Sequence, residues 1–385
     1  MTPPFHVDWI VPDQLFDGEN LRSGLALGFA GGQVVATTTL EALPEQTETT
    51  LLSGTVTPGY IDLQVNGGGD ALFNNAPTVQ SLRTMALAHR RFGTVAVLPT
   101  VITDTPAVLE RAVQAAIAAR DEPGILGLHI EGPHISAARR GTHAAKHVRP
   151  FDDTTFDHVV RLRDAGVRVM ITLAPEAVQP GDVARLVALG AIVSIGHTDA
   201  TASEVKALLD EGACCFTHLF NTMSQMQGRE PGAVGAAINS EAFVGVICDG
   251  HHVADEMIDL ALRARRVPDR TFLVSDAMST VGGSDRFTLY GREISVENGR
   301  LVNSDGALAG AHITLADSVA RMISVLGRTP QAALRMGITV PAMLVGQPAL
   351  ARIEGRAAQD LLILGPDWKP TGTCADHLPD QLPSA

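Results

Sequence analysis

The sequence has few cysteines, no excess of positive charge and no long apolar run, and each shortage excludes a class of protein. Its four cysteines form no Cys-x-x-Cys pair, so we expect reduced, buried thiols rather than a disulfide framework. A net charge of −13 opposes nucleic-acid binding, which needs a basic surface. No apolar run reaches about 18 residues, so no membrane span is expected. The opening "MTPPFHVDWI" lacks the pattern of a signal peptide, and we expect a cytoplasmic protein.

Three common nucleotide and nucleophile motifs are also missing: the P-loop, the Gly-x-Gly-x-x-Gly fingerprint and the Gly-x-Ser-x-Gly elbow. At 385 residues the chain exceeds one average domain, although α/β barrels of about 250 residues form a single unit. One large domain and one small domain are therefore the simplest expectation.

From about residue 56, short apolar segments alternate with helical patterns eight times. The eight strand candidates are 57–65, 94–102, 125–132, 167–174, 191–197, 214–220, 242–250 and 271–278. Parallel strands need crossover helices, and a closed barrel removes the exposed edges of the sheet. The pattern predicts an α/β protein with a (β/α)₈ barrel, and a doubly wound open sheet is the structural alternative.

The segments outside the barrel have strand-like alternation. We predict a small β domain built from residues 1–55 and 351–385, with the barrel domain at 56–350. Residues 287–302 predict a β-hairpin inserted after the eighth strand, with Asn298-Gly299 as its turn.

Four polar side chains stand at the ends of predicted barrel strands: Glu131, His197, His218 and Asp276. Active sites of such barrels lie at the carboxyl ends of the strands, so these residues should converge. Two imidazoles and a carboxylate can hold a metal ion with one position open for water, and a further aspartate can accept that water's proton.

Each of these residues also has an ordinary structural explanation. The two histidines could be hydrogen-bonded structural residues, and Glu131 could form a salt bridge with Arg139 or Arg140. Asp276 could cap a helix, since aspartate is a good N-cap, although the Gly-rich segment that follows favours a loop. The presence of two histidines on neighbouring strands favours the metal site.

Other candidates lie in loops. Arg229, in Gly-Arg-Glu-Pro-Gly, could hold a guanidinium out to an anion, and His252 could join it; Arg229 could equally be a solvated charge. His143 lies in a basic loop and could simply be exposed, and Asn221 could offer its amide to a ligand or cap a turn.

The order of the motifs resembles that of the N-acetylglucosamine-6-phosphate deacetylases of the amidohydrolase superfamily. The motifs that carry this resemblance, between about residues 56 and 345, are "PGYIDLQVNGGGD", "HIEGPH", "GTH", "LAPE", "GHTDA", "THLFN", "GREPG", "DGHH", "VSDAM" and "LAG". The resemblance implies a barrel with a small β-sandwich, assembled as a homodimer. It also implies hydrolysis of the acetamide of N-acetyl-D-glucosamine 6-phosphate in amino-sugar catabolism and cell-wall recycling.

The resemblance implies a role for each candidate. Glu131, His197 and His218 would bind one divalent metal per subunit, with zinc expected and iron, cobalt or manganese as alternatives. Asp276 would be the acid/base, and His143 would polarise the acetyl carbonyl. The substrate would contact His143, Asn221, Thr222, Leu308, Ala309 and Gly310. Its phosphate would contact Arg229 and His252, across the dimer interface.

One departure concerns a second metal. Many amidohydrolases have His-x-His after the first strand and bind two ions, whereas this chain has Gln64 and Asn66, which are poor ligands for a transition metal. We expect them to contribute at most a weak or water-mediated second site. Two alternative functions stay open: deacetylation of another N-acyl amino sugar phosphate such as N-acetylgalactosamine 6-phosphate, or non-catalytic binding of a sugar phosphate on the same fold.

Overall fold

The computed structural model describes residues 6–303, 306 and 308–379. The chain divides into two compact units. The first unit is Asp62–Ser318, and the second consists of Met1–Ile61 and Val319–Ala385. The domain boundaries predicted from the sequence, at 55/56 and 350/351, stay a prediction.

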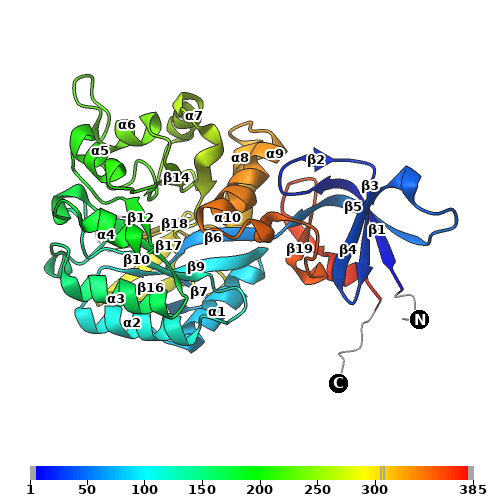
Figure 1. Ribbon diagram of the computed structural model, residues 1–385, viewed down its shortest axis with the longest axis horizontal. Coiled ribbons are helices and arrows are strands. Elements are labelled where there is room, and N and C mark those ends of the chain that lie inside the picture. Colours follow the sequence, from blue (N-terminus) through cyan, green and yellow to red (C-terminus); the bar gives the residue numbers. More distant parts are fainter. Residues whose placement is uncertain (1–5, 304–305, 307, 380–385) are drawn as a thin grey trace. The chain divides into compact units, whose positions relative to one another are not determined.

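The first unit is built around a parallel barrel (Figure 1). Its strands are β6 (Tyr60–Val65), β9 (Thr94–Ile102), β10 (Gly127–Glu131), β11 (Arg168–Leu173), β12 (Ile192–Ile195), β13 (Cys215–Phe216), β14 (Phe243–Val246) and β15 (Thr271–Leu273). They are hydrogen-bonded in chain order. Just beyond β15, the backbone N–H of Asp276 donates to the carbonyl of Gln64 over 3.0 Å and links the last strand to the first. The predicted (β/α)₈ barrel is confirmed.

Helices follow the strands around the outside of the barrel: α1 (Val79–Arg90), α2 (Pro106–Ala118), α3 (Asp153–Asp164), α4 (Asp182–Ala188), α5 (Ala202–Asp210), α6 (Gly232–Asn239) and α7 (Asp255–Ala264). A further helix, α8 (Leu315–Ser324), begins in this unit and continues into the other. The predicted start of α2 is confirmed, because Thr105 Oγ1 accepts from the N–H of Val108 and Pro106 occupies the first turn. All nine residues of β9 are buried, as expected for a strand covered on both faces.

The predicted hairpin insertion contains three strands rather than two. They are β16 (Arg286–Leu289), β17 (Arg292–Glu297) and β18 (Arg300–Asn303), and each pairs antiparallel with the next. The turn at Asn298-Gly299 is confirmed, with positive φ at both residues. The second turn, at Tyr290-Gly291, was missed because tyrosine rarely adopts the left-handed φ of 52° that it has here. A small two-stranded sheet, β7 (Gly67–Gly68) with β8 (Ala71–Leu72), lies after β6.

The second unit contains one mixed seven-stranded sheet made from both ends of the chain. Its strands are β1 (Asp8–Phe16), β2 (Leu21–Arg22), β3 (Leu25–Ala30), β4 (Gln33–Thr39), β5 (Thr49–Pro58), β19 (Leu361–Leu364) and β20 (Pro370–Thr373). Two short helices, α9 (Pro330–Leu334) and α10 (Val340–Leu344), belong to the same unit. The core of the unit combines early residues such as Leu27 and Phe29 with late ones such as Leu361 and Ile363. The predicted β domain from both ends of the chain is thereby confirmed.

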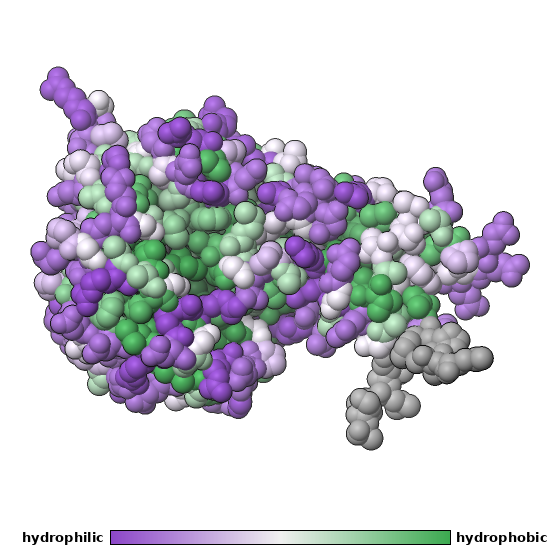
Figure 2. Space-filling model, viewed as in Figure 1, coloured by the Kyte–Doolittle hydropathy of each residue, from purple (hydrophilic) through white to green (hydrophobic). Residues whose placement is uncertain are grey.

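Figure 2 shows the face of the molecule that is also seen in Figure 1. Hydrophilic residues are spread over much of it, and apolar residues gather in a hollow of the barrel unit. Within the described ranges, no helix combines the length and the hydropathy that crossing a membrane requires.

Candidate active site

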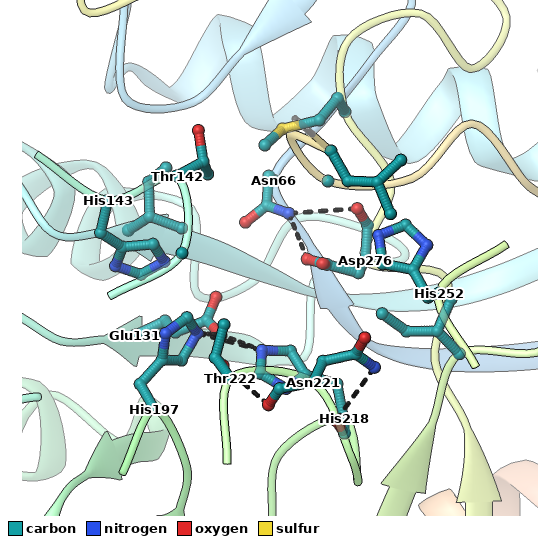
Figure 3. A pocket seen from close by; sticks show the side chains of 16 residues that line it. Asn66, Glu131, Thr142, His143, His197, His218, Asn221, Thr222, His252 and Asp276 are labelled. Atoms are coloured by element: carbon teal, nitrogen blue, oxygen red, sulfur yellow. Dashed lines mark hydrogen bonds and ion pairs between the residues drawn. The ribbon is translucent and has the colours of Figure 1, made fainter. Parts of the chain in front are cut away.

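The four candidate residues lie at the carboxyl ends of their strands, and three of them have unusual backbone geometry. Glu131 is the last residue of β10, whereas His197, His218 and Asp276 follow β12, β13 and β15. These three have φ values of 48°, 30° and 52°. Such values are uncommon for residues other than glycine, and strained conformations of this kind cluster at functional sites. The loops turn sharply here and aim all four side chains into one pocket (Figure 3).

Three atoms converge in this pocket. Glu131 Oε1 lies 3.1 Å from His197 Nε2 and 3.0 Å from His218 Nε2, and the two nitrogens are 3.1 Å apart. All three side chains are buried. Ligands about 2.0–2.1 Å from a tetrahedral ion are separated by roughly 3.3 Å, so only a small expansion of this triangle would admit one.

The orientation of His197 explains why the triangle needs a cation. Its Nδ1 donates to the carbonyl of Arg139 over 3.0 Å, which leaves the lone pair of Nε2 directed at the carboxylate of Glu131. Burial tends to raise the pKa of Glu131, but bonds with His197 and His218 outweigh it and hold this pKa well below its usual range. The triangle therefore requires a positive charge, which a proton or a metal ion can supply, and its donor set fits a divalent metal.

His143 is an alternative to His218 as the third candidate metal ligand. Ligand atoms of Glu131, His143 and His197 also lie within 4.8 Å of one another, and the rings of His143 and His197 are 4.4 Å apart. However, His143 Nδ1 is bonded to Thr103 Oγ1 at 2.7 Å, whereas His218 Nε2 faces the other two ligands directly. Burial, followed by an unfavourable electrostatic interaction with His197, lowers the pKa of His143 to about 3, so its imidazole is neutral.

The two amides at the end of β6 hold the carboxylates in place. Gln64 Nε2 donates to Glu131 Oε1 at 3.0 Å and to Asp276 Oδ1 at 3.2 Å, and Asn66 Nδ2 donates to Asp276 Oδ1 at 2.7 Å. Burial, and then the charge of Glu131, raises the pKa of Asp276 to about 6. A carboxyl group with this pKa can accept and return a proton near neutral pH.

A hydrogen-bond network supports the strained turn at His197. Glu176 accepts from Thr198 Oγ1 and from the N–H of Asp199, both at 2.6 Å. The carboxylate of Asp199 in turn accepts from Arg139 Nε at 2.8 Å, and Arg139 provides the carbonyl that orients His197. Glu176 was not singled out from the sequence, although it lies in the quoted "LAPE" motif.

On the opposite side of the pocket, Asp249 orients His252. The carboxylate accepts from His252 Nδ1 at 2.6 Å and from the N–H groups of His251 and His252 at 2.8 Å. Burial acts to raise the pKa of Asp249, but the bond with His252 outweighs it and lowers the pKa to about 2. The carboxylate of Asp249 occupies His252 Nδ1, so Nε2 is the ring nitrogen left for a ligand. His252 itself lies in the wall of the pocket (Figure 3).

The pocket has a volume of about 150 Å³. Its lining includes most of the predicted site residues, namely Asn66, Glu131, His143, His197, His218, Asn221, Thr222, His252, Asp276, Leu308 and Gly310. Arg229 is exposed and is not part of this lining, and Ala309 is buried behind it. Sequence reasoning missed the apolar lining residues Ile102, Ile247 and Met278, which have no distinctive sequence signal.

Known proteins share this architecture. The chain is 43% identical over 313 residues to the N-acetylgalactosamine-6-phosphate deacetylase of Shewanella sp. (strain ANA-3), covering 80% of this chain and 79% of the relative. It is 31% identical over 332 residues to the N-acetylglucosamine-6-phosphate deacetylase of Haemophilus influenzae, covering 84% and 86%. No protein-family model matches the sequence.

A solved structure of a deacetylase has the same fold. The N-acetylglucosamine-6-phosphate deacetylase of Pasteurella multocida superposes with a TM-score of 0.88 at 31% identity, covering 96% of this chain and 98% of that one. The fold and these relatives define the protein as an enzyme of the amidohydrolase class. Within that class, the chain belongs to the N-acetylglucosamine-6-phosphate deacetylase family.

Proposed function

We propose that the protein hydrolyses the acetamide of N-acetyl-D-glucosamine 6-phosphate to D-glucosamine 6-phosphate and acetate. The observation that carries this proposal is the triangle of Glu131, His197 and His218, with Asp276 linked to it through Gln64. N-acetyl-D-galactosamine 6-phosphate is the second candidate substrate, and the 43% identity to a deacetylase named for that sugar favours its inclusion.

In this proposal Glu131, His197 and His218 hold one divalent metal, with zinc as the first expectation. When bound, such an ion lowers the pKa of water and polarises the amide carbonyl. Two histidines and a carboxylate match the ligand types of known catalytic zinc sites.

Asp276 acts as the proton carrier. It takes the proton of the attacking water and returns it to the departing amine, which cannot leave as an unprotonated anion. The amides of Gln64 and Asn66 fix the direction of its carboxylate, so the proton transfer needs little rearrangement.

His143 stabilises the developing oxyanion. Because the imidazole is neutral and its Nδ1 can accept from the hydroxyl of Thr103, Nε2 carries the proton and can donate to the carbonyl oxygen of the substrate. Asn221 and Thr222, with Leu308, Ala309 and Gly310, would shape the sugar subsite.

The phosphate would bind His252, joined by Arg229 from the second subunit of a homodimer. The exposed position of Arg229, outside the pocket lining of its own chain, is compatible with a role in trans. We further propose a cytoplasmic location, where sugar phosphates are formed. Comparing the solution mass of the protein with 40.5 kDa for one chain tests the dimer directly.

An acetate-release assay tests the proposed function. Purified, metal-loaded protein would be incubated with the 6-phosphates of N-acetylglucosamine and N-acetylgalactosamine and with unphosphorylated N-acetylglucosamine. We expect efficient release from at least the first substrate and a much lower kcat/KM without phosphate. Absence of acetate from both phosphorylated sugars would refute the proposal.

A further inference from the structure

A second cavity, larger than the catalytic pocket, lies beside it. Its volume is about 580 Å³, and it is bounded by the loop that follows β10 and by the three-stranded insertion β16–β18. The two cavities share the wall residues Gly141, Thr142, His143 and Leu308. We call this second space the side cavity.

The side cavity is lined by positive charge in an otherwise acidic protein. Arg140, Lys146 and Arg292 contribute to its wall, and none of the described residues that line it is acidic. One terminal nitrogen of the Arg140 guanidinium donates to the carbonyls of Gly141 and His143, at 3.2 and 2.9 Å. In the part of the chain that the structure describes, Arg140 and Lys146 have no carboxylate partner. Arg140 therefore keeps further N–H donors for a carboxylate.

Another part of the wall is apolar, and one of its residues is linked by hydrogen bonds to His143. Leu289 and Ile294 line the cavity and are each only 2% exposed. The hydroxyl of Tyr290, also in the wall, donates to the carbonyl of Thr103, whose own hydroxyl bonds to His143. Apolar side chains beside Arg140 and Lys146 suit a ligand with a hydrocarbon stem and an anionic end.

The shared wall residues give the direction in which such a ligand would extend. The side cavity includes His143 but not His252 or Asn221. In the function proposed above, on which this inference rests, His143 contacts the acyl carbonyl and His252 contacts the phosphate. The side cavity therefore adjoins the acyl end of the substrate.

We propose that the side cavity binds N-acyl groups longer than acetyl that end in a carboxylate, so that the enzyme also deacylates N-succinyl-type amino sugar phosphates. The chemistry is that of the acetamide. Water adds to the amide carbonyl carbon, the C–N bond breaks, and one proton of the water passes to the amine. The products are the amino sugar phosphate and a dicarboxylate, whose distal carboxylate is held by Arg140 and Lys146.

The test compares three substrates that differ only in the acyl group of glucosamine 6-phosphate: N-acetyl, N-butyryl and N-succinyl. Butyryl has the same chain length as succinyl but no charge, so it separates length from charge. We expect kcat/KM for N-succinyl to exceed that for N-butyryl by about tenfold, the equivalent of roughly 1.4 kcal/mol. Equal values for these two substrates in the wild-type enzyme would overturn the inference.

Variants at the cavity locate the effect. Arg140→Gln with Lys146→Gln removes both proposed partners of the carboxylate. It should reduce the succinyl preference to within about twofold of butyryl while affecting N-acetyl turnover far less. Lys206→Gln, an exposed lysine on α5, is the matched control and should keep the preference. A preference that survives the double variant would place the anion elsewhere and contradict the proposal. If N-acetyl substrate is not hydrolysed either, the proposed function itself has failed; if only the succinyl preference is absent, this inference alone has failed.

Discussion

The side-chain amide of Gln64 donates to Glu131 Oε1 over 3.0 Å, at the position where many amidohydrolases have a metal-binding histidine. Its second contact, with Asp276 Oδ1 at 3.2 Å, uses the same nitrogen. The amide thus presents N–H groups, which cannot coordinate a metal, to both carboxylates. In the proposed mechanism it would couple the metal ligand Glu131 to the proton carrier Asp276, and we expect no tightly held second ion at this corner of the pocket.

The first prediction concerns metal stoichiometry. Because Gln64 and Asn66 act as hydrogen-bond donors, we expect one tightly held divalent ion per subunit. Elemental analysis of purified protein after gentle chelation should give a ratio near one. Two ions per subunit that both resist chelation would contradict this interpretation.

The second prediction concerns the support of His197. Glu176→Gln should weaken metal affinity by about tenfold, at the lower end of the usual 10–100-fold effect of supporting residues, because Glu176 is exposed. Competition with a chromophoric chelator measures this affinity without reference to activity. Glu241→Gln, at an exposed site remote from the network, serves as the control. Unchanged metal affinity in Glu176→Gln would show that the turn at His197 holds without it.

The third prediction concerns Asp249. Asp249→Asn keeps an acceptor for His252 Nδ1 but removes the negative charge from the bond that orients this imidazole toward the phosphate, and a bond to a charged acceptor is the stronger one. KM for the 6-phosphate substrate should rise roughly tenfold, equivalent to about 1.4 kcal/mol. The kcat, and kcat/KM for unphosphorylated sugar, should change little.

Asp269→Asn, an exposed aspartate between α7 and β15, controls for loss of one negative charge. If Asp249→Asn impaired both substrates equally, the contact would be maintaining the pocket as a whole rather than the phosphate site.

The fourth prediction concerns pH. Burial raises the pKa of Asp276 to about 6, and the group is useful as a base only when ionised. Activity should therefore fall as the pH is lowered through about 6, and a bound cation would shift this midpoint downward. A pH profile of kcat/KM measures it. An acid limb well above pH 6 would mean that another group controls the reaction.

The sequence predicted the barrel and the convergence of Glu131, His197, His218 and Asp276 because apolar strands that end in a polar residue leave a clear local pattern. The role of Glu176 was not predictable in this way. Its contacts with Thr198 and Asp199 depend on how neighbouring loops meet, and an exposed glutamate has no distinctive signal. The same applies to the Tyr290-Gly291 turn, where a tertiary bond from Tyr290 to Thr103 accompanies an unfavourable backbone conformation.

The central claim is that Asp276 moves the proton during amide hydrolysis at a metal held by Glu131, His197 and His218. The most direct test is acetate release from N-acetyl-D-glucosamine 6-phosphate by Asp276→Asn, with metal content and substrate binding measured on the same sample. We predict a loss of about 10²–10⁴-fold in kcat, with one metal ion and near-normal substrate binding retained. Turnover close to that of the wild-type enzyme, in a fully metallated variant, would contradict the account.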